Sequence, residues 1–263
     1  MTLLHAKELI PQIRDSYIDL YLDYDGTLAS FAPTPDDILP DDRVIELISQ
    51  LVDSRNVRVS IISGRRLGHI RKLLPIKGIF LAGTYGVEMQ ATNGTEFHQM
   101  PYHIIRPTLE ELKPRWQELI EGKDGFYLED KGWALAIHAR KAEEKLGAQV
   151  LKSAEKMLTQ EVLGEHLQKI HSYRFLEIGP NNADKGHALR YLFDNFHWEG
   201  AVPIYIGDDD KDEEAFQVIN EHDGHSILVS MEPRETEAKY ILDSPDEVHQ
   251  WLREAFLPSL RTR

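Results

Sequence analysis

The feature that most constrains the fold is an alternation of short apolar runs with helical stretches. The runs at Tyr17–Tyr24, Val57–Gly64 and Gly78–Gly83 are rich in aliphatic and aromatic residues and end at turn-forming residues, as buried strands do. Between the first two, Asp41 or Asp42 can cap a helix with apolar residues at helical spacing. Strands that alternate with helices form parallel sheets through right-handed crossovers. The sequence therefore predicts an α/β fold with a doubly wound parallel sheet.

The alternation stops after Gly86 and resumes at Ala201–Asp210. Asn93-Gly94 predicts a hairpin, and the segments beyond it follow an antiparallel pattern with two long helices. They are a helix at 105–120, paired strands at 126–130 and 133–140, a helix at 141–158 with one apolar face, and a strand pair at 167–178. We predict an inserted α+β cap domain over residues 102–179, which interrupts a core formed by residues 1–101 and 180–263.

Composition excludes several classes of protein. Acidic residues number 44 against 30 basic ones, so the net charge of −14 opposes binding to nucleic acid or anionic lipid. The chain has no cysteine, which excludes disulfides and thiolate catalysis. No apolar run is long enough to span a membrane, and the first residues lack the pattern of a secretory signal. We expect a cytoplasmic protein in which an anionic substrate is met by local cations or a metal.

Polar residues follow the predicted core strands where ligands bind to open parallel sheets. Asp23 and Asp25 follow the first strand, and Ser63 follows the second. Lys185 begins a helix on the return to the core, and Asp208–Asp212 follows a later strand. Because the carboxyl ends of parallel strands share one edge of the sheet, these residues are expected to form one site.

The residue types favour phosphoryl-transfer chemistry. Asp23 and Asp25 would share a face of an extended strand, and with Asp208 they form a hard oxygen site for Mg²⁺, to which Asp212 is a further candidate ligand. Asp23 is the predicted nucleophile, since a carboxylate can attack phosphorus to give an aspartyl-phosphate. Asp25 would protonate the leaving alkoxide and then deprotonate the hydrolytic water. The remaining predicted catalytic residues, Ser63 and Lys185, would hold the other phosphate oxygens.

Each motif has an ordinary structural explanation when it is considered alone. Asp-x-Asp-Gly and Ser63-Gly64 are common turn sequences, and Lys185 could be a solvated surface residue. The run Asp208–Asp212 could simply favour a helix N-terminus. Turn formation and capping explain poorly why all four motifs occur in this order at strand ends, so the joint pattern favours catalysis.

The order of these motifs resembles the haloacid dehalogenase superfamily of phosphatases. It reads Asp23-x-Asp25-x-Thr27, then Ser63, then Lys185, then Gly207-Asp208-Asp209-x-x-Asp212. The resemblance implies a Rossmann-like core, Mg²⁺ as cofactor and an aspartyl-phosphate intermediate.

Longer segments are similar to trehalose-6-phosphate phosphatases. The similar segments are DYDGTL at 23–28, SGR at 63–65, Gly86-x-Glu88, EDKGWALAIHAR at 129–140, LEIGP at 176–180, DKGHAL at 184–189 and GDDDKDEEAF at 207–216. This resemblance implies a disaccharide-phosphate substrate and a glycosyltransferase that acts before this enzyme. It implies that Glu129, Lys131 and Glu177 contact the sugar, with Arg65 and Glu88 as further substrate-binding residues.

Three residues depart from the pattern of that family. Tyr85 precedes Gly86 where Asn or His is common, Lys211 stands where Thr is usual, and Trp133 places an aromatic ring in the cap motif, either stacked on a sugar or packed in the interior. A phosphatase of another glycosyl phosphate, such as glucosyl- or mannosyl-3-phosphoglycerate, is therefore an alternative. A phosphotransferase or phosphomutase and a non-catalytic sugar-phosphate-binding module are more distant ones.

Overall fold

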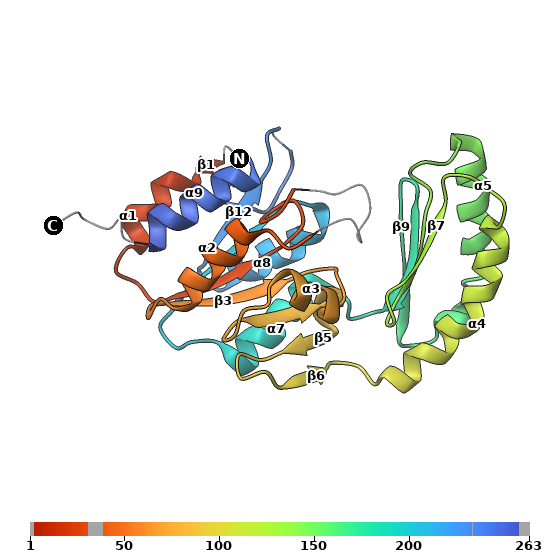
Figure 1. The fold of residues 1–263 in the computed structure, drawn as a ribbon, viewed down its shortest axis with the longest axis horizontal. Coiled ribbons are helices and arrows are strands. Elements are labelled where there is room, and N and C mark those ends of the chain that lie inside the picture. Colours follow the sequence, from red (N-terminus) through yellow and green to blue (C-terminus); the bar gives the residue numbers. More distant parts are fainter. Residues whose placement is uncertain (1–2, 31–38, 233, 258–263) are drawn as a thin grey trace. The chain divides into compact units, whose positions relative to one another are not determined.

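The computed structural model describes residues 3–30, 39–232 and 234–257. The chain divides into two compact units (Figure 1). The core unit comprises the residues up to Phe97 and those from Asp184 onward, and the inserted unit is His98–Ala183. The insertion predicted at 102–179 falls within these limits.

The core unit contains a nine-stranded sheet with the order β1-β13-β12-β11-β2-β3-β4-β5-β6. Every pairing from β1 to β4 is parallel, and β4 pairs antiparallel with β5. The predicted parallel α/β core is therefore confirmed. In sheet order the strands are Leu4–His5, Tyr240–Leu242, His225–Val229, Val202–Gly207, Ile18–Leu22, Val57–Ile62, Phe80–Gly83, Glu88–Gln90 and Glu96–His98.

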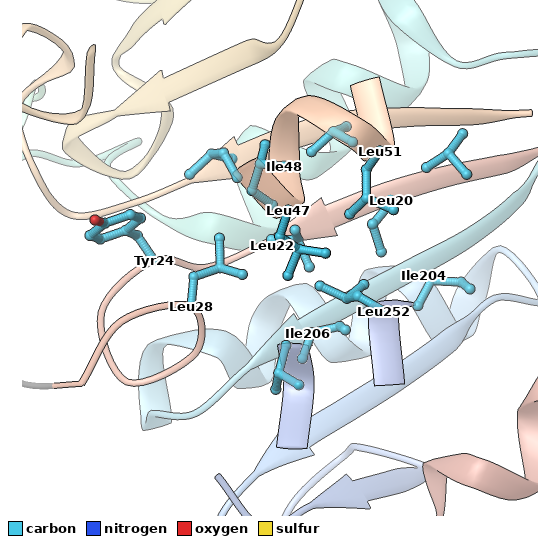
Figure 2. Close-up of a cluster of buried hydrophobic side chains, with 14 of the residues drawn as sticks. Leu20, Leu22, Tyr24, Leu28, Leu47, Ile48, Leu51, Ile204, Ile206 and Leu252 are labelled. Atoms are coloured by element: carbon cyan, nitrogen blue, oxygen red, sulfur yellow. The ribbon is translucent and has the colours of Figure 1, made fainter. Parts of the chain in front are cut away.

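Hydrophobic clusters on both faces of this sheet hold the core helices in place. On one face Leu20 and Leu22 of β2 pack with α2 and α9, as Figure 2 shows, while Tyr21 belongs to a second cluster with residues of α7 and α8. Side chains alternate along a strand, so β2 contributes to both layers. The core helices are η1 (Ala6–Leu9), α1 (Ile10–Ile13), α2 (Asp42–Val52), α3 (Leu67–Leu73), η3 (Thr84–Gly86), α7 (Lys185–Phe196), η4 (Asp210–Asp212), α8 (Glu213–Glu221) and α9 (Pro245–Phe256).

The inserted unit has a four-stranded antiparallel sheet with the order β7-β8-β10-β9 and two long helices, α4 and α5 (Figure 1). The helix predicted at 141–158 is shorter at both ends, and it begins after Glu143 because that carboxylate accepts hydrogen bonds from the backbone N–H groups of Lys145 and Leu146. The elements are α4 (Tyr102–Ile120), β7 (Tyr127–Asp130), β8 (Leu135–His138), α5 (Glu144–Glu155), α6 (Gln160–Leu163), β9 (Leu167–Ser172) and β10 (Phe175–Pro180).

None of the helices in the described ranges combines the length and the apolar character that crossing a bilayer requires.

Candidate active site

Three adjacent strands of the core sheet deliver the first residues of the site. Asp23 follows β2, Ser63 follows β3 and Asp208 follows β11, and β2 pairs with both of the other strands. The parallel hydrogen-bond ladder continues one residue beyond the strands. The backbone N–H of Asp23 donates to the Ile206 carbonyl, and that of Ser63 donates to the Ala82 carbonyl. The sheet thus brings the predicted strand-end residues to one edge.

Lys185 provides the positive charge between the carboxylates of this site. It is the first residue of α7, and its Nζ lies 3.0 Å from Asp23 Oδ1 and 2.6 Å from Asp212 Oδ1. All three side chains are buried. Burial alone would lower the pKa of Lys185, but the carboxylates of Asp212 and Asp23 reverse this effect and raise the pKa. Lys185 is therefore held in its charged form beside the predicted nucleophile and is not a surface residue.

Asp212 organises the loop after β11. Its Oδ1 accepts from Lys185 Nζ and from the Tyr205 hydroxyl, each at 2.6 Å, and its Oδ2 accepts from the backbone N–H groups of Asp208 and Asp209, each at 3.0 Å. Burial favours the neutral acid, yet Lys185 and these donors hold the pKa of Asp212 below its usual value. Two hydrogen bonds to each oxygen suit a residue that positions Lys185 and the loop. The role of Asp212 as a metal ligand stays a prediction.

Asp23, Asp208 and Asp212 form the acidic cluster of the described residues that could hold a metal, with one oxygen from each lying within 4.8 Å of the others. Burial and the adjacent carboxylates of Asp212 and Asp209 raise the pKa of Asp208 to about 7. Burial is also the main reason that the pKa of Asp23 is raised. Buried carboxylates that repel one another are stabilised by a hard cation with oxygen ligands, so the cluster fits Mg²⁺.

Gly26 allows the Asp208 carboxylate to approach the turn after β2. Its φ is +82°, and a Cβ at this position would lie 2.1 Å from Asp208 Oδ2. The neighbouring Thr27 hydroxyl donates to Asp208 Oδ1 at 3.3 Å. Only glycine combines this backbone conformation with this close approach.

The side chain of Asp25 is bound by Arg65. Arg65 donates from Nε to Asp25 Oδ2 and from Nη2 to Asp25 Oδ1, both at 2.6 Å, and the acidic cluster does not include Asp25. The Asp25 side chain thus forms a bidentate ion pair in this structure, and its predicted role as a metal ligand stays a prediction. Sequence reasoning missed this pair because Asp25 and Arg65 are 40 residues apart. Their positions after adjacent parallel strands were the available signal.

Glu88 already has protein partners in this structure. Its Oε1 accepts from the Thr84 hydroxyl at 2.7 Å and from the backbone N–H of Leu67, the first residue of α3, at 3.3 Å. The second contact gives a partner to a backbone N–H at the start of α3, which has no acceptor within the helix. The contact of Glu88 with substrate stays a prediction.

The inserted unit brings together its three predicted sugar-binding residues. Glu129 of β7 and Glu177 of β10 both lie opposite Ala136 of the intervening strand β8. Lys131 Nζ lies 2.6 Å from Glu177 Oε2 and 3.9 Å from Glu129 Oε2. His138, which sequence reasoning missed, has its Nε2 2.9 Å from Glu129 Oε2. The result is a cluster of charged groups on one sheet face.

Trp133 packs in the interior of the inserted unit. It is 3% exposed, with its ring centroid 5.2 Å from that of His98 and 4.9 Å from that of Tyr102. Of the two uses predicted for this ring, the structure shows the packing one.

The parallel core with an inserted α+β unit is the fold of haloacid dehalogenase-type phosphatases. The structure titled C. albicans trehalose-6-phosphate phosphatase C-terminal domain superposes with a TM-score of 0.80 at 23% identity and covers 95% of this chain and 96% of its own. The Candida albicans trehalose synthase regulatory protein C-terminal domain superposes with a TM-score of 0.75 at 12% identity over 96% of this chain and 99% of its own.

Sequence comparison narrows this class to one family. The trehalose-phosphatase family model matches residues 21–246. Trehalose-phosphate phosphatase B of Arabidopsis thaliana is 30% identical over 263 residues, which cover 93% of this chain and 68% of that protein. The chain therefore belongs to the trehalose-phosphatase family and is a phosphoric monoester hydrolase, which confirms the resemblance drawn from the sequence.

Proposed function

We propose that this enzyme hydrolyses trehalose 6-phosphate to trehalose and inorganic phosphate through an aspartyl-phosphate on Asp23. The observation that carries the proposal is the buried Asp23, with Lys185 3.0 Å away and Asp208 in the same oxygen cluster. The family model and the relative from Arabidopsis thaliana are named for trehalose phosphate, and the C. albicans structure is named for trehalose 6-phosphate, which supports the proposed substrate.

In the first half of the reaction an Asp23 carboxylate oxygen attacks phosphorus, and the bond from phosphorus to the sugar oxygen breaks. Asp23 must be ionised for this step, and its burial works against ionisation. The Lys185 ammonium at 3.0 Å opposes that effect. Mg²⁺ held by Asp23 and Asp208 would supply further positive charge for the carboxylates and the phosphate.

Asp25 is the residue proposed to transfer protons. It protonates the leaving sugar oxygen and then removes a proton from the water that hydrolyses the aspartyl-phosphate. Arg65 takes one acceptor position on each Asp25 oxygen, and a carboxylate oxygen has two, so Asp25 can take up a proton without the ion pair opening first. Arg65 is also proposed to bind a phosphate or sugar oxygen, since its guanidinium carries five N–H donors and Asp25 accepts from two of them.

Ser63 is proposed to bind a phosphate oxygen. Its side chain is fully buried after β3, and its Oγ accepts from the backbone N–H of Arg65 at 3.2 Å. With that acceptor position filled, the hydroxyl hydrogen is available to donate to a phosphate oxygen.

Glu129, Lys131 and Glu177 are proposed to bind sugar hydroxyls. Glu177 is 2% exposed and Lys131 is 8% exposed, so two charges are kept largely from water and rely on each other. Charged groups placed in this way form strong hydrogen bonds to vicinal hydroxyls. A glycosyltransferase that produces the sugar phosphate would supply the substrate.

A panel of phosphate esters tests the proposal. We expect trehalose 6-phosphate to give the highest kcat/KM, ahead of glucose 6-phosphate and the glycosyl-3-phosphoglycerates. Glu177→Gln should lower kcat/KM for the disaccharide and leave that for an aryl phosphate unchanged. Rates on trehalose 6-phosphate no better than those on monosaccharide phosphates would refute the proposed substrate.

The covalent mechanism and the non-catalytic alternative need separate tests. The fold also occurs in a regulatory protein, so the fold alone does not distinguish an enzyme from a non-catalytic binding module. The presence of Asp23, Lys185 and Asp208 in this chain favours the enzyme. Asp23→Asn should abolish phosphate release. Substrate binding without turnover in the wild type would favour the binding module, and phosphate capture by an added sugar acceptor would favour a phosphotransferase.

A further inference from the structure

Tyr85 and Lys211 form a contact between two loops of the candidate active site. Tyr85 lies in η3, directly after β4, and Lys211 lies in η4, in the loop after β11. The Lys211 ammonium donates a hydrogen bond to the Tyr85 hydroxyl and lies 4.2 Å from the centroid of its ring. The two residues are 126 positions apart. Both geometries are attractive for a cation on a phenol ring.

The backbone around Tyr85 is held in an uncommon conformation. Thr84 has φ +48° and Tyr85 has φ +54°, and a β-branched residue such as Thr rarely adopts this region. In this conformation the backbone N–H of Thr84 donates to the Arg65 carbonyl at 2.7 Å, and that of Tyr85 donates to the Ser63 carbonyl at 2.9 Å. The strained turn therefore supports the turn that carries Ser63.

The ring of Tyr85 covers the same turn. A Cβ on Gly64 would lie 2.5 Å from both Cζ and Oη of Tyr85, so the phenol rests directly on the Gly64 backbone. Ser63 and Arg65, the residues on either side of Gly64, are the proposed phosphate ligand and the partner of Asp25. Movement of the Tyr85 ring would therefore release the turn that positions both.

Lys211 ties this arrangement to the loop with the acidic cluster. Its backbone N–H donates to Asp209 Oδ1 at 2.8 Å, and Asp208 and Asp209 are in turn fixed by Asp212. The ammonium of Lys211 thus joins the Asp208–Asp212 loop to the ring that lies on Gly64.

We propose that Tyr85 and Lys211 are a pair of positioning residues that sets the Ser63–Arg65 turn relative to the Asp208–Asp212 loop. This inference rests on the phosphate site of the proposed function, but it does not depend on which alcohol is released. The pair acts on the phosphoryl-transfer step, because one loop carries Ser63, the proposed phosphate ligand, and the other carries Asp208 of the acidic cluster.

The test compares Tyr85→Phe, Lys211→Met, the double variant and Lys211→Arg on trehalose 6-phosphate and on p-nitrophenyl phosphate. Tyr85→Phe keeps the ring on Gly64 and removes the acceptor oxygen. We expect each single variant to lower kcat about tenfold on both substrates, the effect of losing one charge-assisted hydrogen bond, with KM changed less than twofold. The double variant should fall no further than the singles, and Lys211→Arg should recover most of the rate.

Tyr191→Phe is the matched control, since Tyr191 is a half-buried tyrosine of α7 packed against Phe97 and Phe196, and it should keep the wild-type rate. Losses that multiply in the double variant would overturn the pairing. A loss confined to the sugar phosphate would overturn the positioning role in favour of a sugar contact.

The two proposals fail in different ways. A wild type that hydrolyses the aryl phosphate but not trehalose 6-phosphate refutes the proposed substrate, and the aryl phosphate then still tests the pair. Hydrolysis of neither ester refutes both proposals.

Discussion

Replacement of Asp212 by Asn tests how the loop after β11 is held. Asp212 is fully buried and accepts two hydrogen bonds from side chains at Oδ1 and two from the backbone at Oδ2. An Asn side chain has one acceptor oxygen and one NH₂ group. With its NH₂ group at the Oδ2 position, the amide faces two backbone N–H donors, so two hydrogen bonds are lost. At the Oδ1 position it faces Lys185, whose hydrogen bond is lost, while the Tyr205 hydroxyl can turn to accept.

The expected cost is about 3–5 kcal/mol of unfolding free energy, because one or two hydrogen bonds to a buried charge are lost and the buried charge of Lys185 loses an anionic partner. Removal of the charge also relieves repulsion with Asp23 and Asp208. However, the pKa of Asp212 is lowered in the folded state, so its charged form is favoured there despite that repulsion. The substitution should therefore destabilise the core unit.

Urea titration with amide hydrogen exchange of β2 and β11 measures this cost in the core unit separately from the inserted unit. Asp210→Asn is the control from the same loop, since the Asp210 side chain is 96% exposed and pairs with Arg234, and it should cost less than about 1 kcal/mol. If Asp212→Asn unfolds within about 1 kcal/mol of the wild type, the inferred role of the four hydrogen bonds is wrong.

Three further predictions concern the metal, a glycine and pH. Mg²⁺ should raise the thermal midpoint of the wild type but not of Asp208→Asn, and an equal rise in both would place the cation elsewhere. Gly26→Ala should abolish phosphatase activity because the new Cβ meets Asp208, whereas Gly94→Ala, also at positive φ but with no atom within 4 Å, should cost about 1 kcal/mol in urea titration and keep the activity. The Arg106 guanidinium holds the pKa of Asp130 well below its usual range, so this carboxylate stabilises the inserted unit above about pH 4 and loses that effect as the pH falls. Asp130→Asn should therefore cost about 1–2 kcal/mol at pH 7 and flatten the acid dependence seen by hydrogen exchange of the inserted unit, and an unchanged acid profile would contradict this.

The pattern of the sequence was sufficient to predict the elements of the core. The runs predicted at Tyr17–Tyr24, Val57–Gly64 and Ala201–Asp210 contain β2, β3 and β11, because the alternation of strands and helices is a local signal that tertiary packing does not override here. The placement of strand-end residues follows from the parallel sheet, so their meeting at one edge was also predictable. The bounds of the helices were less predictable from the sequence, as the start of α5 after its cap Glu143 shows.

The partners of these residues were decided by the tertiary structure. The bond from Lys185 to Asp212, the ion pair of Asp25 with Arg65 and the contact of Tyr85 with Lys211 join residues between 27 and 126 positions apart. Which donor reaches which carboxylate depends on loop conformation and on side-chain rotamers, and neither leaves a periodic signal in the chain. The same holds for Glu129 and Glu177, which meet because the register of three strands places both beside Ala136.

By itself, then, the sequence determined a parallel core, an inserted unit and the family chemistry of phosphoryl transfer, since all of these are encoded by local patterns and motif order. The tertiary structure alone decided that Asp212 positions the loop and Lys185, that Arg65 holds Asp25 and that Tyr85 covers Gly64. The physical reason is that hydrogen-bond partners in a buried site are set by distances of a few ångströms between segments that are remote in the chain.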